Sequence, residues 1–228
     1  MNSGTTNPAT SAKRQKTLVV FAVLGIVGSL IMIVSNLRTP SSKPNQLSCN
    51  GLGQALAKAT ATVINEHGQI AVIILEDYKN EDAPLCAEWT AFCAELRKHS
   101  GIKIVATETV AAESFVDFGP TRARFDSIIR KHPQVSAFVS FCGIPAWDSK
   151  NPFQLPPQGP KLIVLENEPA TPLAEYFAAG NLAVAIMPRL GSPAETAPPK
   201  TPIEWFNQHY QIFTPENYSA QPGGGGPQ

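Results

Sequence analysis

The sequence predicts an α/β fold: a doubly wound three-layer sandwich with about five parallel strands, preceded by one transmembrane helix. Two patterns lead to this prediction. An apolar segment near the N-terminus is long enough to span a bilayer. The remaining chain alternates between helical and strand periodicity, which is typical of βαβ units. Right-handed crossovers between parallel strands would place helices on both faces of the sheet.

The predicted membrane span covers residues 18–37. Its apolar part carries no charge, exceeds the apolar part of a usual signal peptide, and has no clear cleavage site after it. We therefore favour an uncleaved anchor, with a cleaved signal peptide as the alternative. Three basic residues precede the span and two follow it, which favours a cytoplasmic N-terminus. The protein is then expected in a cell inner membrane, crossing it once, with its main domain periplasmic or extracellular.

The rest of the chain divides by composition around one domain. A segment rich in proline and serine separates the span from the first helical pattern, and the C-terminus is rich in glycine and proline. The expected parts are a cytoplasmic segment (1–17), the span (18–37), a linker (38–47), an α/β domain (48–212) and a disordered tail (213–228).

Within the domain, strands are recognised as short apolar runs rich in β-branched residues, as expected for strands covered on both faces. Helices are recognised by their apolar stripe, by proline at the first turn and by glycine after the last. We expect strands at 69–76, 102–107, 135–141, 161–165 and 182–187. We expect helices at 50–66, 84–99, 120–131, 172–179 and 202–210.

The composition argues against several function classes. The chain has 18 basic and 18 acidic residues, so no net positive charge attracts a nucleic acid. Its four histidines show no metal-binding spacing, and there is no P-loop, G-x-S-x-G motif or visible pair of nucleophile and base. We therefore expect no nucleic-acid partner, metal, cofactor or catalytic residue, and a protein that is not an enzyme.

The four cysteines do not form a zinc motif or a disulfide framework, since no C-x-x-C occurs. We interpret them as buried free thiols. A disulfide between Cys142 and another cysteine stays open if the domain lies outside the cytoplasm.

In doubly wound sheets, ligands bind outside the carboxyl ends of the strands. Polar side chains that follow the predicted strands are therefore candidate ligand-binding residues, although each is also compatible with an ordinary solvated loop. They are Asp77, Glu108, Cys142, Glu166, Asn167 and Arg189.

Aromatic residues outside the predicted core are candidates for partner contacts, because exposed aromatic side chains often anchor partners. They are Trp147, Trp205, Phe206 and Tyr210.

Three segments carry a resemblance to a known family. Residues 51–77 read GLGQALAKATATVINEHGQIAVIILED, residues 87–109 read AEWTAFCAELRKHSGIKIVATET, and residues 125–145 read FDSIIRKHPQVSAFVSFCGIP. Together they resemble one lobe of the periplasmic sugar-binding proteins of ABC transporters, a type I periplasmic-binding-protein-like fold shared with the effector domain of LacI-type repressors. The resemblance implies a small polar solute as ligand. The family closes two lobes around its ligand, and this chain has length for only one, so the second wall of any cleft is expected from a second copy, another protein or nothing.

The chain departs from that family at two positions. An arginine that often contacts the sugar is absent from the matching segment, which contains Glu88, Ala91 and Phe92. Where the family tends to place a polar pair after the third strand, this chain has Cys142 and Gly143. These departures leave the sugar specificity open.

Two functions follow as hypotheses. The first is a membrane-anchored, extracytoplasmic, non-catalytic domain that binds a small polar solute. The second is a structural or interaction subunit of a membrane complex that uses a degenerate binding-protein lobe. The expected partners are membrane lipid along residues 18–37, a small polar solute, and a homodimer or membrane-complex partner.

Overall fold

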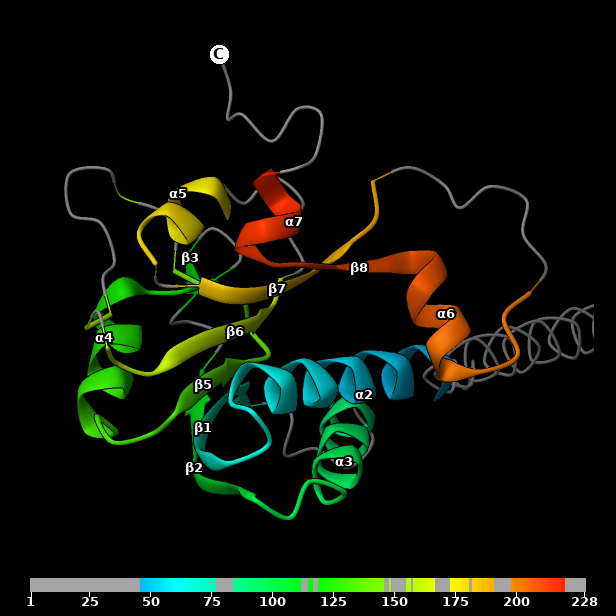
Figure 1. Cartoon of the computed structure of the whole chain (residues 1–228), viewed down its shortest axis with the longest axis horizontal. Helices are drawn as coiled ribbons and strands as arrows, with labels where there is room; N and C mark the ends of the chain where they lie inside the picture. Colours follow the sequence, from blue (N-terminus) through cyan, green and yellow to red (C-terminus); the bar gives the residue numbers. More distant parts are fainter. Residues whose placement is uncertain are drawn as a thin grey trace, which may run out of the picture. The chain divides into compact units, whose positions relative to one another are not determined.

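A six-stranded sheet forms the centre of the described domain in the computed structural model (Figure 1). The structure describes residues 46–76, 84–111, 115–116, 119–145, 148, 155–156, 158–166, 173–180, 182–190 and 198–219. The predicted span at 18–37 lies outside these residues. In the part of the chain that is described, no helix has the length and apolar character needed to cross a bilayer.

The order of strands across the sheet is β2-β1-β5-β6-β7-β8. Their bounds are β1 (Gly68–Leu75), β2 (Ile102–Val110), β5 (Ala137–Ser140), β6 (Lys161–Leu165), β7 (Leu182–Pro188) and β8 (Tyr210–Phe213). The first five are mutually parallel, whereas β8 pairs antiparallel with β7 at the edge. The predicted parallel α/β sheet is therefore confirmed, and one antiparallel strand is added to it.

Six described helices accompany the sheet, and β3 (Phe115–Val116) and β4 (Gly119–Pro120) form a separate two-stranded ribbon. The helices are α2 (Gln46–Val63), α3 (Pro84–Leu96), α4 (Arg122–Lys131), α5 (Leu173–Ala178), α6 (Pro202–His209) and α7 (Pro215–Ser219). Helices α2, α3 and α6 share one core with the sheet, and α4, α5 and α7 adjoin the other. This division gives the three layers that the sequence predicted (Figure 1).

The two cores are separated by the alternation of side chains along the buried strands. In β1, Ile70 and Val72 point toward the layer of α2, while Ala71 and Ile73 point toward the layer of α4 and α5. All four side chains are fully buried. The continuous apolar runs in the sequence are therefore strands covered on both faces, as expected for a parallel sheet.

Helix α2 lies between α3 and α6 and contacts both at closely approaching backbones. A side chain at Gly53 would collide with the backbone of α3 at Glu88, and one at Gly51 would collide with the backbone of α6 at Pro202. The two glycines thus serve helix packing. The helix also begins at Gln46, inside the segment expected to be linker.

The C-terminal end of the domain differs from the prediction. Residues 213–228 were expected to form a disordered tail, but β8 ends at Phe213 and α7 follows it, while residues 220–228 lie outside the described residues. Phe213 is buried, and its ring meets that of Tyr218 edge to face at 5.5 Å. The segment is ordered because β8 pairs antiparallel with β7 and the Phe213 side chain is buried, although the surrounding composition is that of a tail.

Candidate functional site

The carboxyl end of β6 carries a buried carboxylate. Glu166 follows the last residue of β6, and its side chain is almost fully buried. The backbone N–H of Ile144 donates to Glu166 Oε2 at 3.4 Å. The N–H of Glu166 itself donates to the carbonyl of Ile186 at 2.8 Å. Glu166 therefore joins the ends of β5, β6 and β7 at the edge where doubly wound sheets bind ligands.

The chain after β5 is shaped around this carboxylate. Gly143 has φ +71°, a backbone conformation that residues with a side chain rarely adopt. A Cβ at this position would lie 2.9 Å from Glu166 Oε2. Glycine is thus needed twice over, for its backbone angle and for the space that the carboxylate occupies.

Tyr176 of α5 closes the same region from the other side. Its hydroxyl donates to the carbonyl of Pro145, and its ring is buried. Burial raises the pKa of Tyr176 most, the carboxylate of Glu166 raises that pKa further, and the guanidinium of Arg122 partly opposes them. Tyr176 is therefore a neutral hydrogen-bond donor. The charges of Glu166 and Arg122 both influence its pKa at this edge of the sheet.

Cys142 is buried beside this cluster, with its side chain 3% exposed. Its thiol contacts the carbonyl of Ile73 at 3.7 Å, and burial raises the pKa of Cys142 to about 12. The residue is a protonated core thiol and has no nucleophilic character at neutral pH. Cys49, Cys93 and Cys142 are free thiols, so the disulfide left open for Cys142 is absent.

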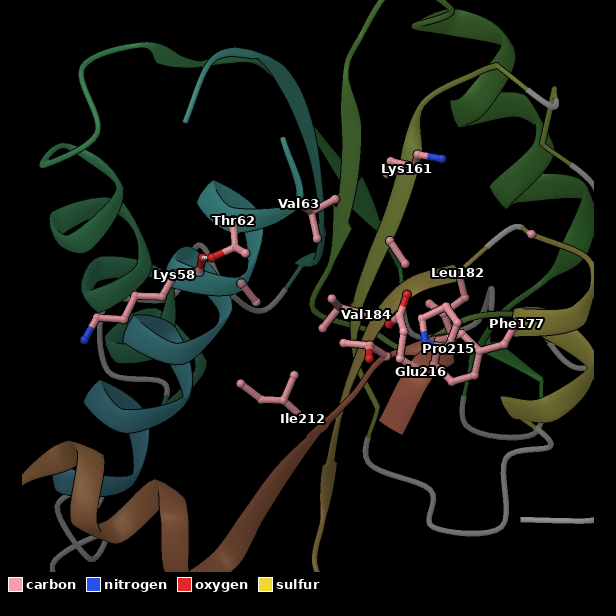
Figure 2. Close-up of a pocket in the computed structure, with 14 residues that line it drawn as sticks. Lys58, Thr62, Val63, Lys161, Phe177, Leu182, Val184, Ile212, Pro215 and Glu216 are labelled. Carbon is pink, nitrogen blue, oxygen red and sulfur yellow. Dashed lines mark hydrogen bonds between the residues drawn. The ribbon is translucent and has the colours of Figure 1, made fainter. Parts of the chain in front are cut away.

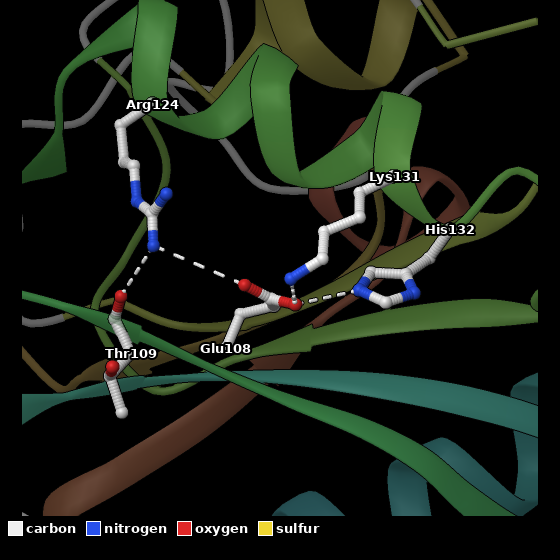
Figure 3. A network of polar contacts seen from close by, with 5 residues as sticks. All are labelled: Glu108, Thr109, Arg124, Lys131 and His132. Carbon is white, nitrogen blue, oxygen red and sulfur yellow. Dashed lines mark hydrogen bonds and ion pairs between the residues drawn. The ribbon is translucent and has the colours of Figure 1, made fainter.

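Glu108 lies apart from Glu166, because β1 and β5 separate their strands by about 14 Å. Figure 3 shows Glu108 with three basic side chains of α4 and its C-cap. Its Oε1 accepts from Lys131 Nζ at 2.6 Å and lies 2.8 Å from His132 Nε2, while Arg124 approaches Oε2 at 4.0 Å. Hydrogen bonds from Lys131 and then His132 hold the pKa of Glu108 below its ordinary value. Glu108 thus ties β2 to α4.

Arg189, at the end of β7, is exposed but also bonded within the domain. Its Nε donates to the carbonyl of Asn207 at 2.9 Å, and its backbone N–H donates to the carbonyl of His209 at 2.8 Å. These bonds hold α6 against the end of β7. Asp77 and Asn167, the two other predicted ligand residues, lie outside the described residues.

The aromatic residues expected to be exposed divide into two kinds. Trp205 is half-buried and stacks on the His209 ring at 4.4 Å, and Tyr210 is half-buried nearby. Phe206, in contrast, is 3% exposed and belongs to the core between α2 and α6. Its expected exposure is therefore wrong, because α6 turns this side chain toward the sheet. Trp147 lies outside the described residues.

A pocket of about 610 Å³ lies at the opposite edge of the sheet, beside the first residues of β6 and β7 (Figure 2). Residues of α2, β6, α5, β7, β8 and α7 line it. No motif in the sequence indicated this pocket, because it depends on how far α6 extends over the sheet. Among the described residues, no group of three or more His, Cys, Asp or Glu side chains could hold a metal ion.

The sheet order, with its reversal between β1 and β5 and helices on both faces, defines a doubly wound α/β fold. No family model matches the chain, and no curated protein matches its sequence. Solved structures of ABC transporter sugar-binding proteins do share the fold, which confirms the resemblance to this type I periplasmic-binding-protein-like architecture.

Two of these structures represent the likeness. One is an ABC transporter solute-binding protein from Burkholderia graminis in complex with D-arabinose, with a TM-score of 0.50, 13% identity, and coverage of 75% of this chain and 61% of that chain. Another, from Agrobacterium vitis and bound with α-D-tagatopyranose, has a TM-score of 0.50, 15% identity, and coverage of 77% and 59%. This chain therefore spans less than two thirds of either.

Proposed function

We propose that this protein is a membrane-anchored, extracytoplasmic, non-catalytic domain that binds a small polar solute at the carboxyl edge of its sheet. The fold supports a binding-protein-like domain, and the solved relatives in fold are solute-binding proteins. The anchor is residues 18–37, with the N-terminus in the cytoplasm. Residues 46–219 supply the binding-like domain.

The observation that carries the proposal is the carboxylate of Glu166 at the end of β6. A carboxylate in a site of low dielectric is a strong acceptor for the hydroxyl groups of a polar solute. The backbone N–H of Ile144 donates to this carboxylate, and the neutral hydroxyl of Tyr176 donates to the carbonyl of Pro145. A solute at this edge would meet a carboxylate acceptor that these bonds hold in place at the strand ends.

A second candidate is a structural or interaction subunit of a membrane complex. This candidate is favoured because two of the predicted ligand-binding side chains already form hydrogen bonds within the domain. Glu108 accepts from Lys131, and Arg189 donates to the carbonyl of Asn207. The half-buried rings of Trp205 and Tyr210 would then be part of the contact surface, in a homodimer or with another subunit.

The two candidates are separated by thermal unfolding of the full chain in detergent against a panel of sugars, polyols and amino acids. A solute that binds only the folded state at one hundred times its Kd stabilises that state by about 2.7 kcal/mol. We expect Glu166→Gln to abolish the shift and Glu216→Gln, a substitution of an exposed residue at the other edge, to retain it.

Alkaline carbonate extraction of membranes tests the anchor. A protein that is anchored by residues 18–37 should stay in the membrane pellet.

If no solute raises the unfolding temperature while the protein unfolds cooperatively, solute binding is rejected. Co-purification from membranes is then the direct measurement for the second candidate.

A further inference from the structure

The pocket at the amino ends of β6 and β7 exists because the helix layer on that face is incomplete. Helix α6 packs against α2 near Gly51 and covers the first half of α2. From Lys58 onward, one flank of α2 borders the pocket instead. The sheet surface over β8 is therefore uncovered at this end, where Ile212 is 38% exposed, whereas Val184 of β7 is 4% exposed.

The floor and walls of the pocket are mainly apolar. Val184 and Ile212 project from β7 and β8, Ala59 and Val63 from α2, and Phe177 closes the end near α5. Figure 2 shows Val184 and Ile212 between the α2 residues and the Phe177 end. A volume of about 610 Å³ lies within the range of small-molecule sites.

The rim carries two lysines and one glutamate. Lys58 and Lys161 stand on opposite sides of Val184 and Ile212, with their ammonium groups directed outward (Figure 2). Neither takes part in an ion pair within the described ranges. Glu216 already interacts with Thr214, whose hydrogen bond lowers the pKa of Glu216. The rim therefore offers two cations on flexible stems that can swing toward a bound anion.

We propose that this pocket binds a small amphipathic carboxylate, with its aliphatic body on Val184 and Ile212 and its carboxylate at the rim near Lys58 or Lys161. The site is separate from the proposed solute site, because Lys161 and Glu166 stand at opposite ends of β6, about 16 Å apart. The lysines outnumber the single acid of the rim, which favours an anion over a neutral or cationic amphiphile.

Decanoate is the probe, and the full chain in lipid nanodiscs is the protein. Equilibrium dialysis measures the decanoate retained by discs with wild-type protein against matched discs with Ala183→Phe. Ala183 is half-buried in the pocket lining, and phenylalanine suits a strand while filling the space. Because both discs dissolve decanoate equally in their lipid, the difference reports the pocket. Decanol serves as the neutral analogue.

A second variant, Lys58→Glu with Lys161→Glu, changes only exposed side chains and keeps the test independent of folding defects. We expect wild-type discs to retain more decanoate than Ala183→Phe discs. The double charge reversal should weaken decanoate binding roughly tenfold, since each exposed pair contributes little, and should leave decanol unaffected. Glu166→Gln should retain decanoate binding, which separates this site from the proposed solute site.

Equal retention by wild-type and Ala183→Phe discs overturns the proposal. Decanol binding as strong as decanoate binding, with no effect of the charge reversal, overturns the anionic chemistry. If Ala183→Phe discs contain less protein mass than wild-type discs but retain the same amount of decanoate, the pocket is instead occupied by a second copy of the chain or by a helix of a partner.

Discussion

At the residue scale, Gly143 and Glu166 constrain one another at the carboxyl edge of the sheet. A methyl group at Gly143 would add backbone strain at φ +71° and would also press on the carboxylate at 2.9 Å. We expect Gly143→Ala to lower the free energy of unfolding by about 3 kcal/mol, of which the strain alone is about 1 kcal/mol. Urea denaturation measures this loss.

The chain contains a matched control for that substitution. Gly180 has the same φ of +71°, but nothing lies within 4 Å of a Cβ built there. Gly180→Ala should therefore cost only the strain of about 1 kcal/mol. If both substitutions cost the same, the carboxylate of Glu166 moves freely and the cluster is less rigid than its geometry implies.

A second residue-scale prediction concerns the pH dependence of stability at Glu108. Because its folded pKa lies below the ordinary value of 4.5, Glu108 stabilises the fold fully above that pH. The stabilisation is lost as the pH falls through the lower, folded pKa. We expect Glu108→Gln to cost about 1–2 kcal/mol at neutral pH, since Lys131 is largely exposed. The variant should also show a flatter loss of stability in acid.

Glu66 provides the comparison for Glu108, since it also faces a histidine. Its side chain is 67% exposed, and its Oε1 lies 3.6 Å from His99 Nδ1. Glu66→Gln should change the unfolding free energy by only a few tenths of a kcal/mol. If both substitutions change the acid unfolding curve equally, the contact of Glu108 between β2 and α4 contributes no more to stability than the exposed contact of Glu66.

At the element scale, α6 presents one buried and one exposed apolar side chain within a single helix. Phe206 is 3% exposed against α2, whereas Ile203 is 42% exposed. We expect Phe206→Ala to lower the free energy of unfolding by about 3–5 kcal/mol by leaving a cavity. Ile203→Ala should change it by about 0.5 kcal/mol or less. If both substitutions change the free energy of unfolding only slightly, α6 does not unfold cooperatively with the rest of the domain.

The contrast between β6 and β8 shows which elements the sequence can predict. The run Lys161–Leu165 was predicted with its observed bounds, since a continuous apolar run after a glycine and proline has few alternatives. Strand β8 was missed, because a four-residue strand with one buried side chain, Phe213, gives no periodic signal of its own. It forms because β7 offers an unpaired edge.

The candidate site was predictable in position more than in detail. The rule that ligands lie at the carboxyl ends of parallel strands selected Glu166, which the structure places at the end of β6. The burial of Cys142 agrees with its interpretation as a buried thiol. The burial of Phe206 depends on which way α6 turns, and that direction was not predicted from the sequence. The pocket beside β7 was unpredictable for the same reason, since it is the space that α6 leaves.

At the scale of the whole molecule, the fold joins segments from both ends of the described chain. Helix α2 is the first described element, yet the side of Gly51 is covered by α6, which follows the fifth parallel strand. Strand β8 and helix α7 then cover the far edge of the sheet. The native core is therefore complete only when the C-terminal elements are in place.

This arrangement has a consequence for the order of synthesis. A ribosome that adds about 5–20 residues each second makes α2 on the order of ten seconds before α6 emerges. During that interval, the apolar flank of α2 that α6 covers has no intramolecular partner. A nascent chain that stalls before Pro202 therefore exposes the apolar flank of α2. Chaperones and quality-control proteases recognise such exposed apolar surface.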